Sequence, residues 1–187
     1  MFTRRKLAAG FAAVLLSPIG VSLAADATAT RKFPLPERGD FQMTVPTAWN
    51  DQLHQPPQAL PPTIAFRARQ GKPFEVLVTP IWRARPGIPV ATKDTIRQNV
   101  QKAANDAKSQ AVEEAISIVE FSGSAGPGYY FSATDKAPKP GEYKYMTQGM
   151  LKVNDLTVTF TILTNDGQEQ VTTDAIGMLK SAVHVQP

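Results

Sequence analysis

Hydrophobic and polar residues alternate along much of the chain, which is the pattern of β-strands that bury one face. The alternation is present in residues 41–45, 64–69, 116–121, 129–134, 143–153 and 156–163. Residues 74–82 differ, because odd and even positions are both apolar, and this indicates an inner strand that is covered above and below. The pattern predicts a sheet of about six to seven strands.

Two other segments show the three- and four-residue spacing of helices that pack by one face. Thr92 is placed to cap the first helix, which we expect to run to about Val112 with an alanine-rich buried stripe. The second helix closes the chain, and Asp166 and Glu169 have the spacing of a capping box at its start. Small alanines on the first stripe would let that helix lie close to the sheet.

Turn residues separate these elements and set the connections between them. Asn154 and Asp155 form a two-residue hairpin turn between adjacent strands. Proline-rich residues 54–62 and the loops at 122–128 and 136–141 interrupt the strand pattern. Strands, a helix, more strands joined by hairpins and a last helix predict an α+β fold, in which helices pack against an antiparallel sheet.

The N-terminal residues have the order of an export signal. Positive residues at 4–6 precede an apolar run at 7–16, and small residues follow. We expect residues 1–24 to be a signal peptide that is cleaved near Ala24 or Ala25. The processed protein would then be periplasmic or secreted.

Two alternatives concern this segment. A retained membrane anchor is disfavoured, because glycine, serine and proline interrupt the run and a stable span needs about 20 strongly apolar residues. We therefore expect no transmembrane helix in the processed protein. The export route, Sec or twin-arginine, stays open because Arg4 and Arg5 fit both. Residues 25–36 are mostly small and polar and predict a flexible segment, followed by a single α+β domain at 37–187.

Charge and cysteine content restrict the partners and the chemistry. The chain has 20 lysines and arginines against 16 aspartates and glutamates, but three of the basic residues lie in the signal, so the processed domain is nearly neutral. This balance argues against a nucleic-acid partner. The chain has no cysteine, so neither a disulfide nor thiol chemistry is available and an apolar core must hold the fold.

Four short motifs resemble the PsbP-like fold family, which is named for an extrinsic subunit of photosystem II and includes many exported bacterial proteins. The motifs are FQMTVP at 41–46 followed by Trp49, GYYF at 128–131, DLTVTF at 155–160 and MLKS at 178–181. The resemblance covers nearly all of the predicted domain. It implies an antiparallel sheet between helices, an α/β/α sandwich, and a role as a binding or accessory module. It brings no catalytic residue with it.

Side chains that carry out catalysis are few and scattered. The two histidines, His54 and His184, lie in a proline-rich loop and near the last residue, so they do not predict a catalytic pair. Met146 and Met150 share a strand face, and thioethers bind copper(I), but two sulfurs do not make a site and we expect them to pack in the core. The sequence predicts no catalytic residue, no metal site and no cofactor.

One basic set is a candidate binding surface. It surrounds the turn between the second and third predicted strands and consists of Arg67, Arg69, Lys72, Trp82, Arg83 and Arg85. We hypothesise that this set docks an envelope protein or an anionic membrane surface, with the arginines orienting the partner and the tryptophan adding contact area. The alternative is a solvated strand edge whose charges discourage strand addition.

A second set favours a different function. An apolar groove between sheet and helix would be lined by Tyr129, Phe131, Tyr143, Tyr145, Met146 and Met150. The sequence thus predicts an exported, non-enzymatic binding or accessory protein of the bacterial cell envelope. The alternative is a carrier of an apolar small molecule or lipid in that groove.

Overall fold

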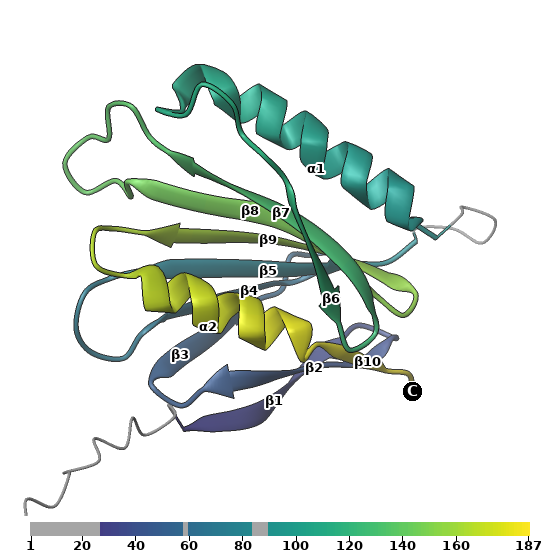
Figure 1. Ribbon diagram of the computed structural model, residues 1–187. Coiled ribbons are helices and arrows are strands. Elements are labelled where there is room, and N and C mark those ends of the chain that lie inside the picture. Colours follow the sequence, from purple (N-terminus) through teal and green to yellow (C-terminus); the bar gives the residue numbers. More distant parts are fainter. Residues whose placement is uncertain (1–26, 58–59, 84–89) are drawn as a thin grey trace, which may run out of the picture.

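The computed structural model describes residues 27–57, 60–83 and 90–187 (Figure 1). The predicted signal peptide and cleavage site lie outside these residues. The elements in chain order are β1 (Thr28–Leu35), β2 (Gly39–Pro46), β3 (Trp49–His54), β4 (Thr63–Ala68), β5 (Glu75–Ile81), α1 (Lys93–Ala107), the 3-10 helix η1 (Lys108–Gln110), β6 (Val119–Gly123), β7 (Gly126–Thr134), β8 (Tyr145–Val153), β9 (Leu156–Thr164), α2 (Glu169–Lys180) and β10 (Val183–Val185).

Seven strands form one antiparallel sheet in the order β3-β4-β5-β9-β8-β7-β6. The β8–β9 hairpin turns at Asn154, whose φ is +54°, a left-handed conformation that asparagine tolerates. Even-numbered residues of β9 from Leu156 to Thr164 are buried and odd-numbered ones are half-buried. The predicted hairpin and the predicted face of this strand are both confirmed.

The remaining three strands form a second sheet in the order β1-β2-β10. Its first strand corrects the prediction of a flexible segment at residues 25–36. Residues 28–35 pair along their full length with β2, and Phe33 and Leu35 enter the core. The polar residues that suggested disorder form the exposed end of an edge strand.

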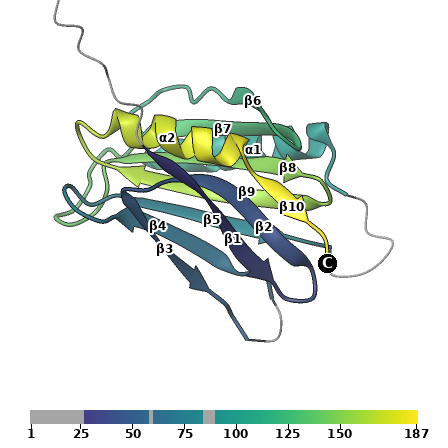
Figure 2. The same cartoon turned by 90° about the horizontal axis from the view of Figure 1, so that it is seen from below.

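The two faces of the large sheet are covered differently (Figures 1 and 2). One face carries α1, which contacts β7 and β8. The other carries α2 and the small sheet, which contact each other through α2 and β2. The structure is therefore α+β as predicted, with two antiparallel sheets and two helices.

Each face has its own apolar core. Side chains of the small sheet, α2 and the central strands form the larger cluster, which includes Phe41, Phe66, Phe160 and Leu179. Beneath α1 a smaller cluster contains Ile96, Val100, Ala104 and Phe131. Neither helix of the described segments is long and apolar enough to cross a bilayer.

The start of α1 follows the prediction and its end does not. The Thr92 hydroxyl accepts a hydrogen bond from the backbone N–H of Thr95 at 3.1 Å, so Thr92 is the predicted cap. The α-helix stops at Ala107, short of Val112. The reason is tertiary: Ala111 is extended and forms an isolated bridge with Asp135, the residue after β7.

The predicted capping box of α2 is wrong. The Asp166 carboxylate is occupied by Lys144 and Tyr145, and Gln168 stands at the N-cap without a side-chain bond to the helix. The Gln168 amide instead donates to the carbonyl oxygens of Lys72 and Pro73, both at 3.2 Å. The start of α2 is thus held by the loop before β5.

Candidate functional site

A cleft of about 660 Å³ opens between α2 and strands β7 and β8. Volumes of this size are typical of small-molecule sites. Seven of its twelve lining residues carry a hydroxyl group, which sets it apart from the apolar core beside it. The lining residues are Tyr130, Ser132, Tyr145, Thr147, Thr164, Asn165, Glu169, Thr172, Thr173, Ile176, Gly177 and Lys180.

Cross-strand pairs of β7 and β8 form the floor of this α2 cleft. Ser132 lies opposite Thr147, and their hydroxyl oxygens are 2.7 Å apart. On one side of this pair Tyr130 lies opposite Gly149, and on the other Tyr145 lies opposite Thr134. The floor therefore has a tyrosine at each end and hydroxyl groups between them.

Gly149 is required for this floor. A β carbon at residue 149 would lie 2.3 Å from the carbonyl oxygen of Tyr129 and 2.7 Å from the β carbon of Tyr130. Both distances are far below van der Waals contact. The missing side chain lets Tyr130 lie directly against its partner strand.

One side of α2 forms the opposite wall. Glu169, Thr173, Gly177 and Lys180 recur at three- and four-residue steps, so they share a helix face. A β carbon at Gly177 would have no neighbour within 4 Å. The cleft thus reaches the helix backbone at this position.

The two charges of the lining have opposite signs and lie at opposite ends of α2. Glu169 is in the first turn and Lys180 in the last, where each complements the helix dipole. No described residue forms an ion pair with either side chain. The lining as a whole is electrically balanced.

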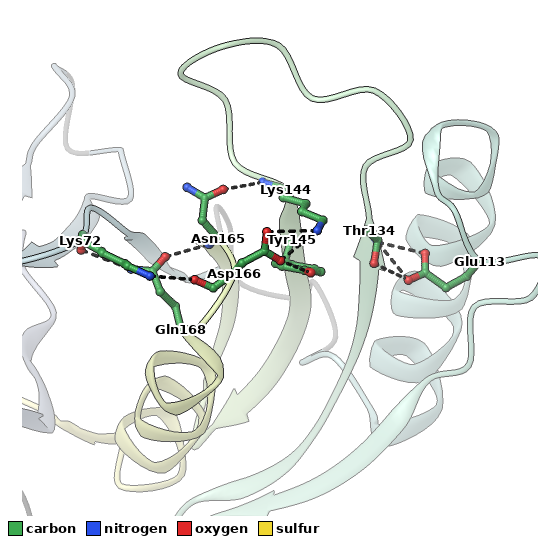
Figure 3. Close-up of polar contacts among 8 residues, drawn as sticks. All are labelled: Lys72, Glu113, Thr134, Lys144, Tyr145, Asn165, Asp166 and Gln168. Atoms are coloured by element: carbon green, nitrogen blue, oxygen red, sulfur yellow. Dashed lines mark hydrogen bonds and ion pairs between the residues drawn. The ribbon is translucent and has the colours of Figure 1, made fainter.

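A network of polar contacts fixes one end of the cleft (Figure 3). The Tyr145 hydroxyl donates to Asp166 Oδ1 at 2.6 Å, and Lys144 Nζ lies 2.9 Å from the same oxygen. The hydrogen bonds from Tyr145 and Lys144 hold the pKa of Asp166 below its usual value. Lys72 reaches the Asp166 carbonyl oxygen at 3.2 Å. The Tyr145 ring is thereby held in one orientation.

A second contact in Figure 3 lies toward α1, where Glu113 accepts bonds from Thr134. The Thr134 backbone N–H is 2.9 Å from Glu113 Oε2, and its hydroxyl is 2.7 Å from Oε1. Partial burial raises the pKa of Glu113, but the two bonds from Thr134 outweigh it, and the net effect is a lowered pKa. This carboxylate is committed to holding the end of β7.

The predicted apolar groove is not one groove. Phe131 is fully buried beneath α1, and Tyr129 beside it donates its hydroxyl to Glu120 at 2.9 Å. Met150 lines a pocket of about 130 Å³ next to α1. Tyr145 lies on the opposite face of the sheet, in the α2 cleft.

The other two members of that set meet in a separate cavity. Tyr143 and Met146 line a space of about 320 Å³ at the end of α1, together with Ala111, Ala133 and Leu163. Lys144 and Asp135 supply polar groups to its wall. This α1-end cavity is the part of the structure that most resembles the predicted apolar site.

The basic set is spread over both ends of β5. Arg67 forms an ion pair with Glu75, and Arg69 donates to the Trp49 carbonyl oxygen at 3.4 Å. Trp82 is half-buried against the larger core cluster, and with Arg83 it follows the far end of the strand, about 23 Å away from Glu75.

The two remaining members of the basic set are Lys72 and Arg85. Lys72 is bonded to the α2 cleft network, and Arg85 lies outside the described residues. The described members are not gathered at the end of one hairpin as the sequence suggested.

The two histidines lie in different surroundings. His54 is exposed at the end of β3, whereas His184 in β10 is buried. His184 Nδ1 is 2.7 Å from Asp155 Oδ1, and Nε2 is 2.7 Å from the Arg38 carbonyl oxygen. Both ring nitrogens are occupied by structural partners, so this histidine does not face a substrate site.

Metal-ligating side chains do not gather in the part of the chain that the structure describes: no three histidines, aspartates or glutamates lie close enough together to hold an ion. Comparisons with known proteins add no family. No family model matches the chain, and no curated protein matches it. The cavities of the structure are therefore the basis for assigning a function.

Sequence reasoning missed most residues of the α2 cleft. A signal was present: Tyr130, Ser132, Tyr145 and Thr147 occupy positions that continue, along β7 and β8, the face on which Leu151 is buried. Polar residues at positions whose strand neighbours are core residues indicate a break in the packing above them. That break is the cleft.

Proposed function

We propose that the protein is an exported, non-enzymatic binding protein of the cell envelope, and that the α2 cleft holds its ligand. The observation that carries the proposal is the cleft itself, whose wall combines a larger apolar surface with several polar groups. The cleft lies beside the buried apolar core and exposes hydroxyl, amide and charged groups to the solvent. Several of these groups, including the Tyr130 and Thr172 hydroxyls and both helix-end charges, have no partner among the described residues. Convergent polar groups in a cleft of this volume are the usual features of a ligand site.

The lining also favours binding over hydrolysis. Glu169 is its single carboxylate, and no histidine lies among the lining residues. A hydrolase of the two-carboxylate type needs a second acid, and a nucleophilic mechanism needs a base next to the nucleophile. Ser132 meets only the hydroxyl of Thr147.

Amide chemical shifts of the isotope-labelled processed protein test this proposal. Low-molecular-weight envelope extract should shift the amides of Tyr130, Thr147 and Gly177 in a saturable manner. Shifts confined to Arg67 and Arg69 would place the site on the basic set instead. An unchanged spectrum would contradict a binding function.

Export is tested separately. The full chain, expressed in a bacterium, should appear in the periplasmic or secreted fraction with a new N-terminus near residue 25. Replacement of Arg4, Arg5 and Lys6 by glutamine should keep the protein in the cytoplasm. Wild-type protein that stays in the cytoplasm with an intact N-terminus would contradict the proposed export.

The α1-end cavity supports a second candidate, a carrier of a small apolar molecule. Its wall combines Met146, Leu163 and alanines with the ring of Tyr143, whose pKa is raised by burial and by the nearby Glu75 carboxylate. Native mass spectrometry of protein purified without detergent should then show a retained apolar mass. Ala133→Phe, which fills this cavity, should remove the mass, and Gly177→Ala should keep it.

A further inference from the structure

The ligand class of the α2 cleft can be read from the chemistry of its wall, on the basis that the cleft is the binding site proposed above. Tyrosine, serine and threonine hydroxyls both donate and accept hydrogen bonds, and so does the Asn165 amide as a whole. Four of the seven hydroxyls, those of Ser132, Thr147, Tyr145 and Thr173, already bond within the protein, and the other three have no partner among the described residues. Because each hydroxyl oxygen can take more than one hydrogen bond, a ligand that fits this lining must itself carry groups that donate and accept. Polyhydroxyl molecules have this property.

Two tyrosine rings add a second property. Tyr145 lies opposite Thr134, four residues beyond Tyr130 on β7, so the two tyrosines are separated by about 13 Å along the floor. Flat aromatic faces provide apolar area for the C–H faces of a ring, while their hydroxyls stay polar. A spacing this large exceeds one sugar ring and suits a short chain of them.

Both rings are held before any ligand arrives. The Tyr130 ring packs against Phe121 with centroids 5.8 Å apart. Tyr145 is fixed by its bond to Asp166 and by Lys144 Nζ, which lies 5.1 Å from the ring centroid. Rigid platforms reduce the entropy lost on binding.

Charge and strand pairing argue against the two main rivals. Glu169 and Lys180 balance each other, so the lining does not select an anion. β7 and β8 are each hydrogen-bonded to neighbours on both sides, so their backbones offer no free edge to an extended peptide. A neutral ligand recognised through side chains remains.

We propose that the α2 cleft binds a neutral oligosaccharide, with Tyr130 and Tyr145 contacting sugar rings and the Ser132–Thr147 pair bonding the hydroxyls between them. Gly177 leaves the opposite wall low enough for the sugar chain to lie along α2. Glu169 is the one carboxylate of the lining, and Asp166 at the end of the cleft is bonded to Tyr145 and Lys144, so the site presents no free pair of acids for cleavage of the sugar.

Gly177 supplies a matched pair of variants for the test. Its β-carbon position is open and its backbone is helical, so larger side chains are accommodated without a clash at that atom. Gly177→Trp projects a ring into the cleft, and Gly177→Ala adds one methyl group. Far-ultraviolet circular dichroism and urea unfolding of both variants confirm that each is folded.

The probes are neutral trisaccharides of glucose, mannose and N-acetylglucosamine, with triglycine and inorganic phosphate for comparison. Isothermal titration calorimetry of the processed protein should detect at least one trisaccharide. We expect Gly177→Trp to lose at least tenfold in affinity and Gly177→Ala to lose less, whereas His54→Ala, at an exposed strand end outside the cleft, should stay within about twofold of the wild type. Tyr130→Ala should also lower the affinity for the trisaccharide that binds.

Three outcomes overturn the inference. The first is that no trisaccharide binds at millimolar concentration, and the second is that triglycine or phosphate binds better than every sugar. The third is that a sugar binds equally well to Gly177→Trp. If envelope extract still shifts the cleft amides in the first two cases, the proposed binding function survives and only the sugar assignment fails.

Discussion

Two groups of polar side chains in this protein differ in how fully they are used. Around His184 every polar contact is internal: the ring joins β10 to Asp155 in the β8–β9 turn and to Arg38 in the turn before β2. In the α2 cleft the Tyr130 hydroxyl and the charged side-chain groups of Glu169 and Lys180 have no partner among the described residues. Both groups lie on the side of the large sheet that carries α2.

The difference separates stabilisation from recognition. A buried polar group must be satisfied, because an unpaired one costs about 1 to 3 kcal/mol. The His184 cluster meets this requirement and should matter mainly to stability. The unpartnered cleft groups are open to solvent, which a ligand can replace, so they should matter mainly to binding.

The largest expected effect is a loss of stability when the His184 cluster is disrupted. His184→Ala removes a buried ring and leaves Asp155 and the Arg38 carbonyl without their partner, so we expect the unfolding free energy to fall by about 2 to 4 kcal/mol. Urea denaturation measures this loss. His54→Ala, at an exposed strand end, should change stability by less than about 0.5 kcal/mol. Equal losses of unfolding free energy for the two substitutions would contradict a stabilising role of the His184 cluster.

An intermediate effect concerns pH. The lowered pKa of Glu113 means that its ionised form stabilises the fold at pH values above the ordinary value of 4.5, and that this contribution is lost as pH falls through the lower folded value. Glu113→Gln should therefore be less stable than the wild type at pH 7, by about 1 kcal/mol. The difference should shrink below pH 4. Urea unfolding at both pH values tests this, and a constant difference would contradict it.

The smallest expected effect is a gain on the cleft side. Gly177→Ala replaces a helical glycine whose β-carbon position is open, so we expect about 0.5 to 1 kcal/mol of added stability. Thermal unfolding followed by circular dichroism measures it. Gly149→Ala is the contrasting control, because its β carbon would clash with Tyr129 and Tyr130, and it should destabilise the protein. A loss of stability in Gly177→Ala would contradict the open space at this β-carbon position.

Local signals in the sequence predicted the elements that depend on local patterns. The Thr92 cap, the turn at Asn154 and the alternation of β9 each involve residues close together in the chain. β3 and β10 were missed because β3 has polar residues at most positions and β10 has three residues. Edge strands of this kind are defined by a partner strand, which the local pattern does not reveal.

The candidate site was harder to predict for the same reason. Alternation correctly placed Met146 and Met150 on one strand face, but it did not show which helix covers each face. The basic residues were close in sequence, yet β5 separates Arg69 from Arg83. A cleft arises where α2 leaves part of β7 and β8 uncovered, and this depends on the packing of the whole domain.

The pairing of β10 with β2 constrains the order in which the protein is completed. Val183 of β10 lies opposite Gln42 of β2. The early-synthesised β2 therefore cannot complete its pairing until β10 has been synthesised. Until those residues have left the ribosome, the small sheet lacks an edge and Asp155 lacks its imidazole. Docking of β10 onto β2 should therefore be among the last steps of folding, whatever the speed at which the large sheet forms.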